Sequence, residues 1–372
     1  MKTIAMMMAA LILCGTCACS LAAFDLKPYM YEDNSVIPFN RNTQMILTSD
    51  DAEHRVRLEQ NGTVIQEVTL KKNGDRLNVV LGENGNIGII TRPDLAGGQA
   101  DQLYYRWNTD NTLSEPVRLN DDAGFLYACG NGFYGVQRAG ENDEIFICDA
   151  DGERIFSRIY ASQGDAHISP MDCVHNEDGT YLLAVLKENL DTYEHTIIVE
   201  RITTDGAVLW QEVFSGRYGY DGCVLSDDGE GGAFLVKTDD DNYKLEQVYR
   251  IGADGQMLWT KRLEAEGLIL HAFCGGYNAQ AGGLVLDGNA VSNSKSVYKV
   301  IRMLIGNEGQ IMSASAKDFS SRPDYGFTVC RAVDGSVFVQ SRANYLDTKN
   351  TKHVLVPVDD LPETSVPVLI LE

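Results

Sequence analysis

A short turn motif returns six times along this chain of 372 residues. Its two clearest copies, residues 204–210 (TDGAVLW) and 253–259 (ADGQMLW), place an Asp-Gly pair before an apolar run that ends in Trp. Four weaker copies are centred on Gly62, Asn111, Gly152 and Gly309. A polar turn with Gly between two apolar runs is typical of a β-hairpin. Because successive centres lie 41 to 54 residues apart, the sequence indicates a repeat of small antiparallel sheets.

This repeat predicts an all-β fold, a single β-propeller of four-stranded antiparallel blades. The six turn centres define six blades, and residues 196–202 and 208–214 are read as the third and fourth strands of one of them. Four further strand-like runs follow, at residues 327–333, 336–341, 352–358 and 366–371. We therefore expect seven blades, with six or eight as alternatives. Because an exposed sheet edge is a liability, we expect a terminal strand to close the ring, and residues 24–36 are the candidate.

Six residues are assigned a structural role in the repeat. They are Asp205, Gly206, Trp210, Asp254, Gly255 and Trp259. Asp and Gly stand where a hairpin turn demands positive φ, so the turn explains them without a bound calcium ion. The Trp residues are read as anchors that pack one blade on another.

Arginine recurs five residues before the turn centre in four copies, at Arg57, Arg106, Arg201 and Arg250. A cluster that binds a carboxylate ligand is one interpretation. Because the four positions are equivalent in the repeat, the sequence favours similar salt bridges between neighbouring blades.

Five cysteines occupy another equivalent position, in the strand expected to lie nearest the axis. They are Cys129, Cys173, Cys223, Cys274 and Cys330, and Cys148 lies elsewhere. Equivalent positions in adjacent blades face the same way, which disfavours disulfide geometry. The prediction is therefore buried free thiols, although an even number of cysteines in an exported chain would also suit disulfides.

Residues 1–22 have the pattern of a secretory signal peptide, which leaves residues 23–372 as the propeller domain. Lys2 precedes an apolar stretch at residues 4–13, and small residues follow at 20–23. The stretch is too short for a membrane span. A lipid anchor at Cys19 is an alternative. We expect a secreted or cell-envelope protein with no membrane span.

The two strongest copies of the motif resemble the PQQ-like (quinoprotein-type) repeat, in which a Gly turn precedes an apolar strand ending in Trp. Residues 152–156 carry a partial copy. The resemblance implies the propeller fold of exported bacterial proteins. Family dehydrogenases hold their quinone with adjacent cysteines and a calcium site, and this sequence has no adjacent cysteines. The expectation is a member that binds no cofactor and no metal.

The formal net charge of −22 argues against nucleic acid as a partner, since phosphate must be neutralised by Lys and Arg. No His pair has metal-ligand spacing and no Gly-rich phosphate loop occurs, so the catalytic residues are unknown. We predict a monomeric binding or scaffold protein with a protein or cell-surface glycan as ligand. The alternative is an extracellular carbohydrate-active hydrolase or lyase with carboxylates in the axial funnel.

Overall fold

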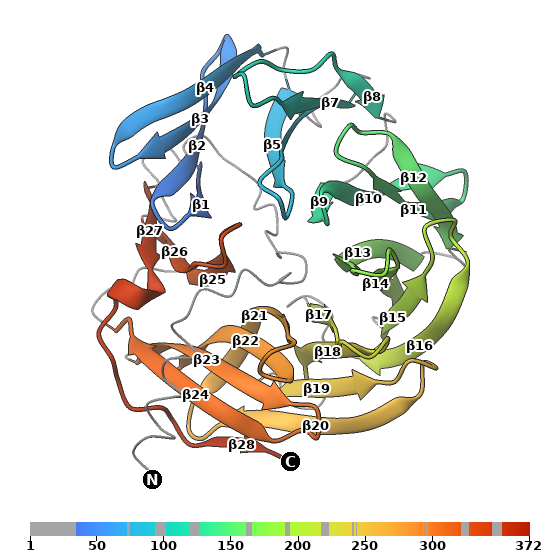
Figure 1. Cartoon of the computed structure of the whole chain (residues 1–372), viewed down its shortest axis with the longest axis vertical. Helices are drawn as coiled ribbons and strands as arrows, with labels where there is room; N and C mark the ends of the chain where they lie inside the picture. The colour runs from blue at the N-terminus through green and yellow to red at the C-terminus, as the bar shows by residue number, and fades with distance from the viewer. Residues whose placement is uncertain are drawn as a thin grey trace.

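Seven antiparallel sheets are arranged as the blades of a propeller around a central axis in a computed structural model of the chain (Figure 1). The structure describes residues 35–72, 75–93, 102–119, 126–160, 166–189, 194–216, 223–239, 242, 244–292, 294, 297–320, 327–343 and 352–372. The predicted signal peptide and almost all of the predicted closing strand lie outside these residues. Within them, no helix has the length and hydropathy that a membrane-spanning helix needs.

The first four blades are consecutive four-stranded meanders. Blade 1 comprises β1 (Ser35–Asn40), β2 (Thr43–Ser49), β3 (Glu53–Gln60) and β4 (Thr63–Lys71). Blade 2 comprises β5 (Asp75–Leu81), β6 (Ile87–Pro93), β7 (Gln102–Trp107) and β8 (Val117–Leu119). Blade 3 comprises β9 (Leu126–Cys129), β10 (Gly132–Ala139), β11 (Asn142–Cys148) and β12 (Arg154–Tyr160). Blade 4 comprises β13 (Ala166–His175), β14 (Tyr181–Asn189), β15 (Glu194–Ile202) and β16 (Val208–Gly216).

The last three blades depart from this regularity at the C-terminus. Blade 5 comprises β17 (Cys223–Asp227), β18 (Ala233–Thr238), β19 (Glu246–Ile251), β20 (Met257–Ala265) and a fifth strand, β28 (Leu369–Leu371). Blade 6 comprises β21 (Ile269–Asn278), β22 (Gly283–Val291), β23 (Tyr298–Gly306) and β24 (Ile311–Asp318). Blade 7 has three strands, β25 (Phe327–Arg331), β26 (Val337–Ala343) and β27 (Lys352–Pro357), and the short 3-10 helix η1 (Val358–Asp360) follows.

The predicted seven-bladed propeller is therefore confirmed, and its core lies between blades. All of the first six residues of β14 are buried, because both faces of this strand are covered by neighbouring sheets. One apolar cluster combines Leu182 and Trp210 of blade 4 with Leu235 and Ile251 of blade 5. In each blade the first strand lies nearest the axis, and in blades 1 to 6 the fourth strand forms the outer wall (Figure 1).

The predicted closing strand at residues 24–36 lies almost entirely outside the described residues, so its role in closing the ring stays a prediction. β1 pairs with β2 of its own blade. Among the described residues, side chains and one backbone bond join blades 1 and 7. The backbone N–H of Val333 donates to the carbonyl of Phe39 at 3.1 Å, and Gln340 Nε2 donates to the carbonyl of Val36 at 2.7 Å. Arg41 adds an ion pair to Asp360 at 2.8 Å.

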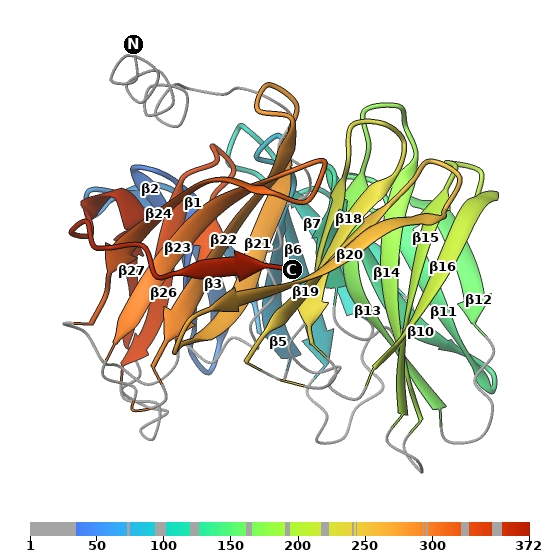
Figure 2. The same ribbon diagram turned by 90° about the horizontal axis from the view of Figure 1, so that it is seen from below.

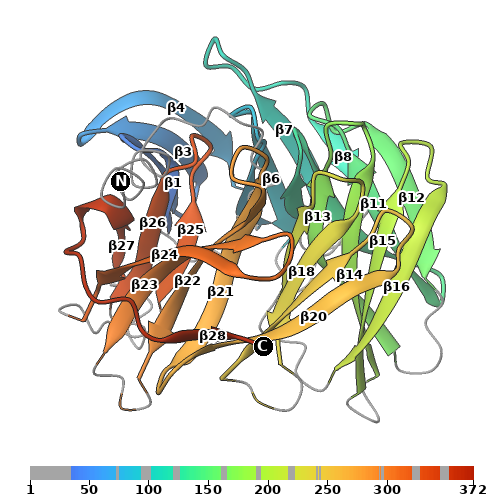
Figure 3. The same cartoon turned by 60° about the horizontal axis from the view of Figure 1, so that its bottom comes forward.

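The last predicted strand, at residues 366–371, does not join blade 7 as the sequence suggested. After η1 the chain passes along the outside of blade 6 and reaches blade 5, where β28 pairs antiparallel with β20 (Figure 3). Leu371 lies opposite Leu263, and Lys317 of β24 forms an isolated bridge with Glu363 on the way. The outer edge of blade 5 is thus covered by the protein's own C-terminal segment.

The expectation that all six cysteines are free thiols is wrong for one pair. Cys129 of β9 and Cys173 of β13 form a disulfide with their Cα atoms 5.5 Å apart. The first strands converge toward the axis, so equivalent positions in adjacent blades approach closely enough to be bridged. The remaining four, Cys148, Cys223, Cys274 and Cys330, are buried free thiols, and the predicted first-strand position of the five equivalent cysteines is confirmed.

Two kinds of turn lie at the same end of the blades. The turns between first and second strands and those between third and fourth strands share what we call the hairpin face. The other connections lie at the opposite face (Figure 2). The repeated Asp-Gly and Asn-Gly turns therefore all belong to the hairpin face.

Candidate functional site

The six assigned repeat residues lie in and beside the hairpin turns between third and fourth strands. Gly206 and Gly255 have φ of 86° and 82°, a conformation that glycine adopts without strain. The Asp254 side chain accepts the backbone N–H of Gln256 at 3.1 Å, and Asp205 accepts the hydroxyl of Thr203. These carboxylates are thus used within their own turns.

In three copies of the motif the aromatic residue, Phe156, Trp210 or Trp259, packs on the turn glycine of the next blade. A Cβ atom added to Gly206 would stand 2.5 Å from the Phe156 ring, and one added to Gly309 would stand 3.3 Å from Trp259. Trp259 also donates its indole N–H to the carbonyl of Asn307 at 2.8 Å. The motif therefore links blade 3 to blade 4, blade 4 to blade 5 and blade 5 to blade 6, each time through one aromatic ring and one glycine.

Three of the four repeated arginines contact the following blade. Arg106 pairs with Asp151 of blade 3, Arg201 reaches Asp227 of blade 5, and Arg250 donates to the carbonyl of Asn307 in blade 6. Arg57 pairs with Glu59 of its own strand at 3.2 Å. The predicted salt bridges between blades are confirmed at Arg106 and Arg201, whereas Arg250 crosses through a hydrogen bond.

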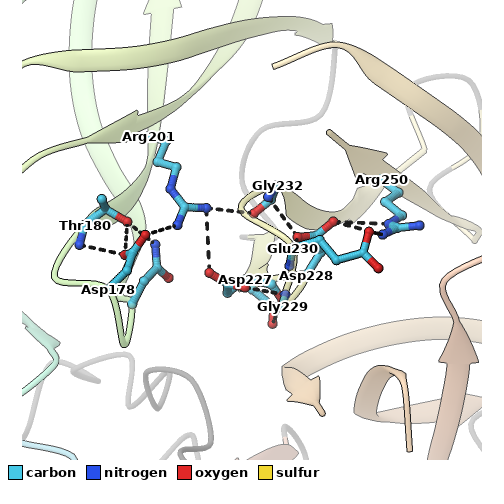
Figure 4. A network of polar contacts seen from close by, with 11 residues as sticks. Asp178, Thr180, Arg201, Asp227, Asp228, Gly229, Glu230, Gly232 and Arg250 are labelled. Carbon is cyan, nitrogen blue, oxygen red and sulfur yellow. Dashed lines mark hydrogen bonds and ion pairs between the residues drawn. The ribbon is translucent and has the colours of Figure 1, made fainter. Parts of the chain in front are cut away.

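Arg201 and Arg250 belong to a polar network on the hairpin face of blades 4 and 5 (Figure 4). Arg201 Nη2 lies 2.9 Å from Asp178 Oδ2, and its Nη1 lies 3.7 Å from Asp227 Oδ2 and 3.4 Å from the carbonyl of Gly232. Because Arg201 is only 4 % exposed, its charge is compensated by groups from two blades at once.

The second half of the network is centred on Arg250. Its Nε and Nη2 lie 3.2 Å and 3.1 Å from Asp228 Oδ2, and Nη2 also lies 2.8 Å from Glu230. Asp228 Oδ1 in turn accepts the backbone N–H groups of Glu230 at 2.9 Å and Gly232 at 2.8 Å. The arginine of one strand thus fixes the turn between β17 and β18.

Two carboxylates beside Arg201 have pKa values displaced in opposite directions. Burial raises the pKa of Asp227 above its ordinary value, and the neighbouring charges of Asp228 and Asp178 raise it further. Burial alone would also raise the pKa of Asp178, but hydrogen bonds from Thr180 and the charge of Arg201 outweigh it and lower the value. Opposed pKa values are the arrangement that acid–base catalysis uses. However, the guanidinium of Arg201 contacts both carboxylates, so both are already paired with a cation.

We interpret this network as a structural clamp between blades. No group of three or more His, Cys, Asp or Glu side chains suited to a metal ion occurs in the part of the chain that the structure describes. Nearly every carboxylate of the network is used by an arginine or by a turn amide, which leaves little free chemistry.

A second candidate surface lies on the outer wall, where a β-bulge recurs. In five blades the third residue after the turn centre is the unpaired residue of a bulge in the fourth strand. These residues, which we call the bulge band, are Ile65, Ile155, Leu209, Leu258 and Met312. All five are large apolar side chains that are 40–55 % exposed. Bulges re-aim side chains, and here the effect is to turn an apolar residue toward solvent at each repeat.

The remaining exposed apolar residues extend the same surface. Among the described residues, each large apolar side chain that is exposed belongs either to a fourth strand or to the C-terminal segment. Outside the bulge band they are Val64, Ile159, Val208, Val213, Met257, Val366 and Val368. They lie on the outer walls of blades 1 and 3–6 and on the C-terminal segment. Contiguous apolar surface of this kind marks sites of protein contact.

The sequence did not reveal this surface. The apolar column three residues after the turns indicates only the second strand of a hairpin, and its exposure depends on the bulge. A bulge leaves no mark in the hydrophobic pattern, because the apolar run Val208–Trp210 is continuous whichever side chain turns outward.

The fold and these two surfaces define the chain as a seven-bladed β-propeller. No protein-family model matches the sequence, and no curated protein matches it. Among solved structures, the β-propeller domain of the Trilobed protease from Pyrococcus furiosus is similar, with a TM-score of 0.52 and 12 % identity over 94 % of this chain and 97 % of that domain. That domain has an open velcro topology.

A second similar structure is the acylaminoacyl peptidase of Pyrococcus horikoshii. Its TM-score is 0.50 at 9 % identity, over 91 % of this chain and 52 % of that chain. This chain therefore spans about half the length of that peptidase. Likeness at such low identity shows the shared fold alone.

Proposed function

We propose that this protein is an exported or surface-attached β-propeller that serves as a binding scaffold, with a protein as its ligand. It resembles the PQQ-like repeat proteins that bind no cofactor, on the strength of the motif at residues 204–210 and 253–259. We propose that it works as a monomer in the cell envelope or outside the cell. A cell-surface glycan is the alternative ligand.

The observation that carries this proposal is the bulge band. Apolar side chains that are about half exposed cost free energy in water, roughly 25 cal/mol for each Å² that a partner could cover. They recur on the outer walls of five blades, of which blades 3 to 6 are consecutive, and the fourth strands hold them on a rigid support. A partner that covers part of the outer wall would remove this apolar area from water.

One observation favours a second function, an extracellular carbohydrate-active hydrolase or lyase. Asp178 and Asp227 have oppositely displaced pKa values and lie on the hairpin face. Against it, Arg201 contacts both carboxylates. The binding function therefore accounts for more of the surface than the enzymatic one does.

Affinity purification from the native envelope fraction tests the proposal. The bait is the full chain, compared with a variant in which Ile155, Leu209 and Leu258, in the consecutive blades 3, 4 and 5, are replaced by Ser. We expect a partner that is retained by the unchanged protein and lost at least tenfold with the variant. Equal retention by the two baits, together with glycan turnover that Asp227→Asn abolishes, would favour the hydrolase.

A further inference from the structure

The C-terminal strand β28 shows how this scaffold holds an extended segment. It adds to the unpaired edge of β20 and places Leu369 and Leu371 against the apolar cluster between blades 5 and 6. The face of β24 that covers it carries Ala314 and Ala316, and Ala316 is only 1 % exposed. The seat thus consists of the edge of one blade and the facing side of the next blade's fourth strand.

The same two components recur between blades 3 and 4. The seven-residue strand β12 is the outer edge of its sheet, and no described strand pairs with that edge. β12 packs on the third strand of blade 4, because Tyr160 donates its hydroxyl to Glu200 at 2.7 Å and Arg158 lies 3.0 Å from the same carboxylate. The next strand outward in blade 4, β16, is therefore the facing strand.

The facing side of β16 is apolar and exposed. Trp210 and Phe214 point toward blade 5, where they join its apolar cluster. Successive side chains in a strand alternate between faces, so Gln211 and Val213 point toward blade 3. Val213 stands seven residues after its turn centre, as Ala316 does in blade 6. It is 53 % exposed, whereas Ala316 is covered.

Other blade edges match the occupied seat less well. The edge strand of blade 2, β8, has only three residues. In blade 5 the position equivalent to Val213 is Arg262, which pairs with Asp239 at 2.7 Å. In blade 2 it is Arg118. The comparison covers blades that the structure describes with four strands and whose next blade also has a described fourth strand. Among them, the edge of β12 alone combines a full-length edge strand with an exposed apolar residue, Val213, on the facing strand.

We infer that the edge of β12 binds an extended segment of a partner protein, which adds as a fifth strand to blade 3 and places alternate apolar side chains against Leu209 and Val213. Strand addition of this kind takes its affinity from main-chain hydrogen bonds and its specificity from alternate side-chain contacts. The net charge of −22 disfavours a second copy of this chain as the occupant. This inference rests on the proposed function and names the partner's chemistry.

The test uses a displayed library of random 12-residue peptides selected against the full chain. We expect enriched peptides with apolar residues at alternate positions. Val213→Asp should weaken their binding at least tenfold. Asn42→Asp adds the same negative charge in an exposed turn of the hairpin face, away from the outer wall, and should change binding less than twofold. Thermal unfolding confirms that each variant is folded.

A second probe separates strand addition from apolar adhesion. The best peptide is resynthesised in two versions, or phases, with N-methyl groups on the odd-numbered residues in one and on the even-numbered residues in the other. Each version lacks the backbone N–H donors on one side of the strand. One phase should lose binding at least tenfold, and amide hydrogen exchange should slow in β12 when the unmodified peptide binds.

Several outcomes would overturn the inference. They are a selection that enriches no peptide, equal weakening by Val213→Asp and Asn42→Asp, and full binding by both N-methylated peptides. Concentration-dependent dimers that Val213→Asp abolishes would assign the edge to a second copy instead. If these occur while the triple Ser variant still loses its envelope partner, the proposed function stands and this inference alone fails.

Discussion

Gly255 of blade 5 lies directly against Trp210 of blade 4. A Cβ atom added to Gly255 would stand 2.7 Å from Cβ and 3.2 Å from Cγ of the tryptophan. The same glycine has a φ of 82°. One residue therefore meets two independent demands, a left-handed turn and an unobstructed approach of the neighbouring indole.

Gly255→Ala tests whether this contact holds adjacent blades together. The alanine is strained at positive φ and collides with Trp210, so we expect a loss of about 2–4 kcal/mol in the free energy of unfolding. Gly62→Ala is the matched control. Gly62 has a similar φ of 76° but no atom within 4 Å of an added Cβ, so only the strain of about 1–2 kcal/mol remains. Urea denaturation measures both, and equal losses would contradict the account.

Asp287 should make stability depend on acid pH. It is buried between Arg302 and Arg331. Burial by itself would raise the pKa of this carboxyl, but the two guanidinium charges outweigh it and hold the pKa below 3.8. A lowered folded pKa stabilises the protein above the unfolded pKa, and that contribution is lost as pH falls through the folded value.

Asp287→Asn measures this contribution. At pH 7 it leaves two guanidinium groups without their shared counter-charge, so we expect a loss of about 3–5 kcal/mol. The difference from the unchanged protein should shrink below pH 3.8. Asp359→Asn, which removes an exposed partner of Arg41, should cost at most about 1 kcal/mol. A loss by Asp287→Asn that is independent of pH would contradict the assignment.

Glu83 should make the folded protein less stable as pH rises toward neutral, which is the opposite of the effect of Asp287. Burial raises the pKa of this carboxyl from 4.5 to about 7, and its Oε1 has no hydrogen-bond partner among the described residues. The folded protein then holds a proton that the unfolded chain releases between these values, so stability falls as pH rises from 4.5 to 7. Glu83→Gln should therefore stabilise the protein at pH 8 by on the order of 1–2 kcal/mol, and very little at pH 4.5. Unfolding curves at the two pH values that change equally would refute this.

The Cys129–Cys173 disulfide should stabilise the join between blades 3 and 4. It closes a loop with a sequence separation of 44, for which loop entropy gives about 4 kcal/mol. Cys129→Ala with Cys173→Ala should lose up to this amount, and added reductant should then have no further effect. Cys223→Ala, at a buried free thiol, should keep the response to reductant. A reductant response that persists in the double variant would contradict the pairing.

Much of the fold could be predicted from the sequence because the turns are local. Gly206 and Gly255 mark their hairpins within a few residues, and the column of first-strand cysteines follows from counting along the repeat. The destination of residues 366–371 could not be predicted, because a run such as Leu369–Leu371 suits any open sheet edge. The choice of blade 5 depends on the path along blade 6, where Thr364 donates to the carbonyl of Ala316 at 3.1 Å.

The candidate surfaces also differ in how far the sequence predicts them. The clamps made by Arg106 and Arg201 follow from an arginine column that the sequence displays. The bulge band does not, since the exposure of Leu209 depends on one residue of register between β15 and β16. The Cys129–Cys173 pair was also beyond sequence reasoning, because it depends on how closely the inner strands converge.

The most direct measurement places a photo-crosslinking amino acid at single positions and reads partner adducts in the native envelope. Leu209 and Leu258 report on binding at the outer wall. Asp334, in a turn of the hairpin face, reports on binding at that face instead. The account predicts a protein adduct from both wall positions and none from Asp334. Adducts from Asp334 alone, with none from Leu209 or Leu258, would contradict the claim that the outer wall is the binding surface.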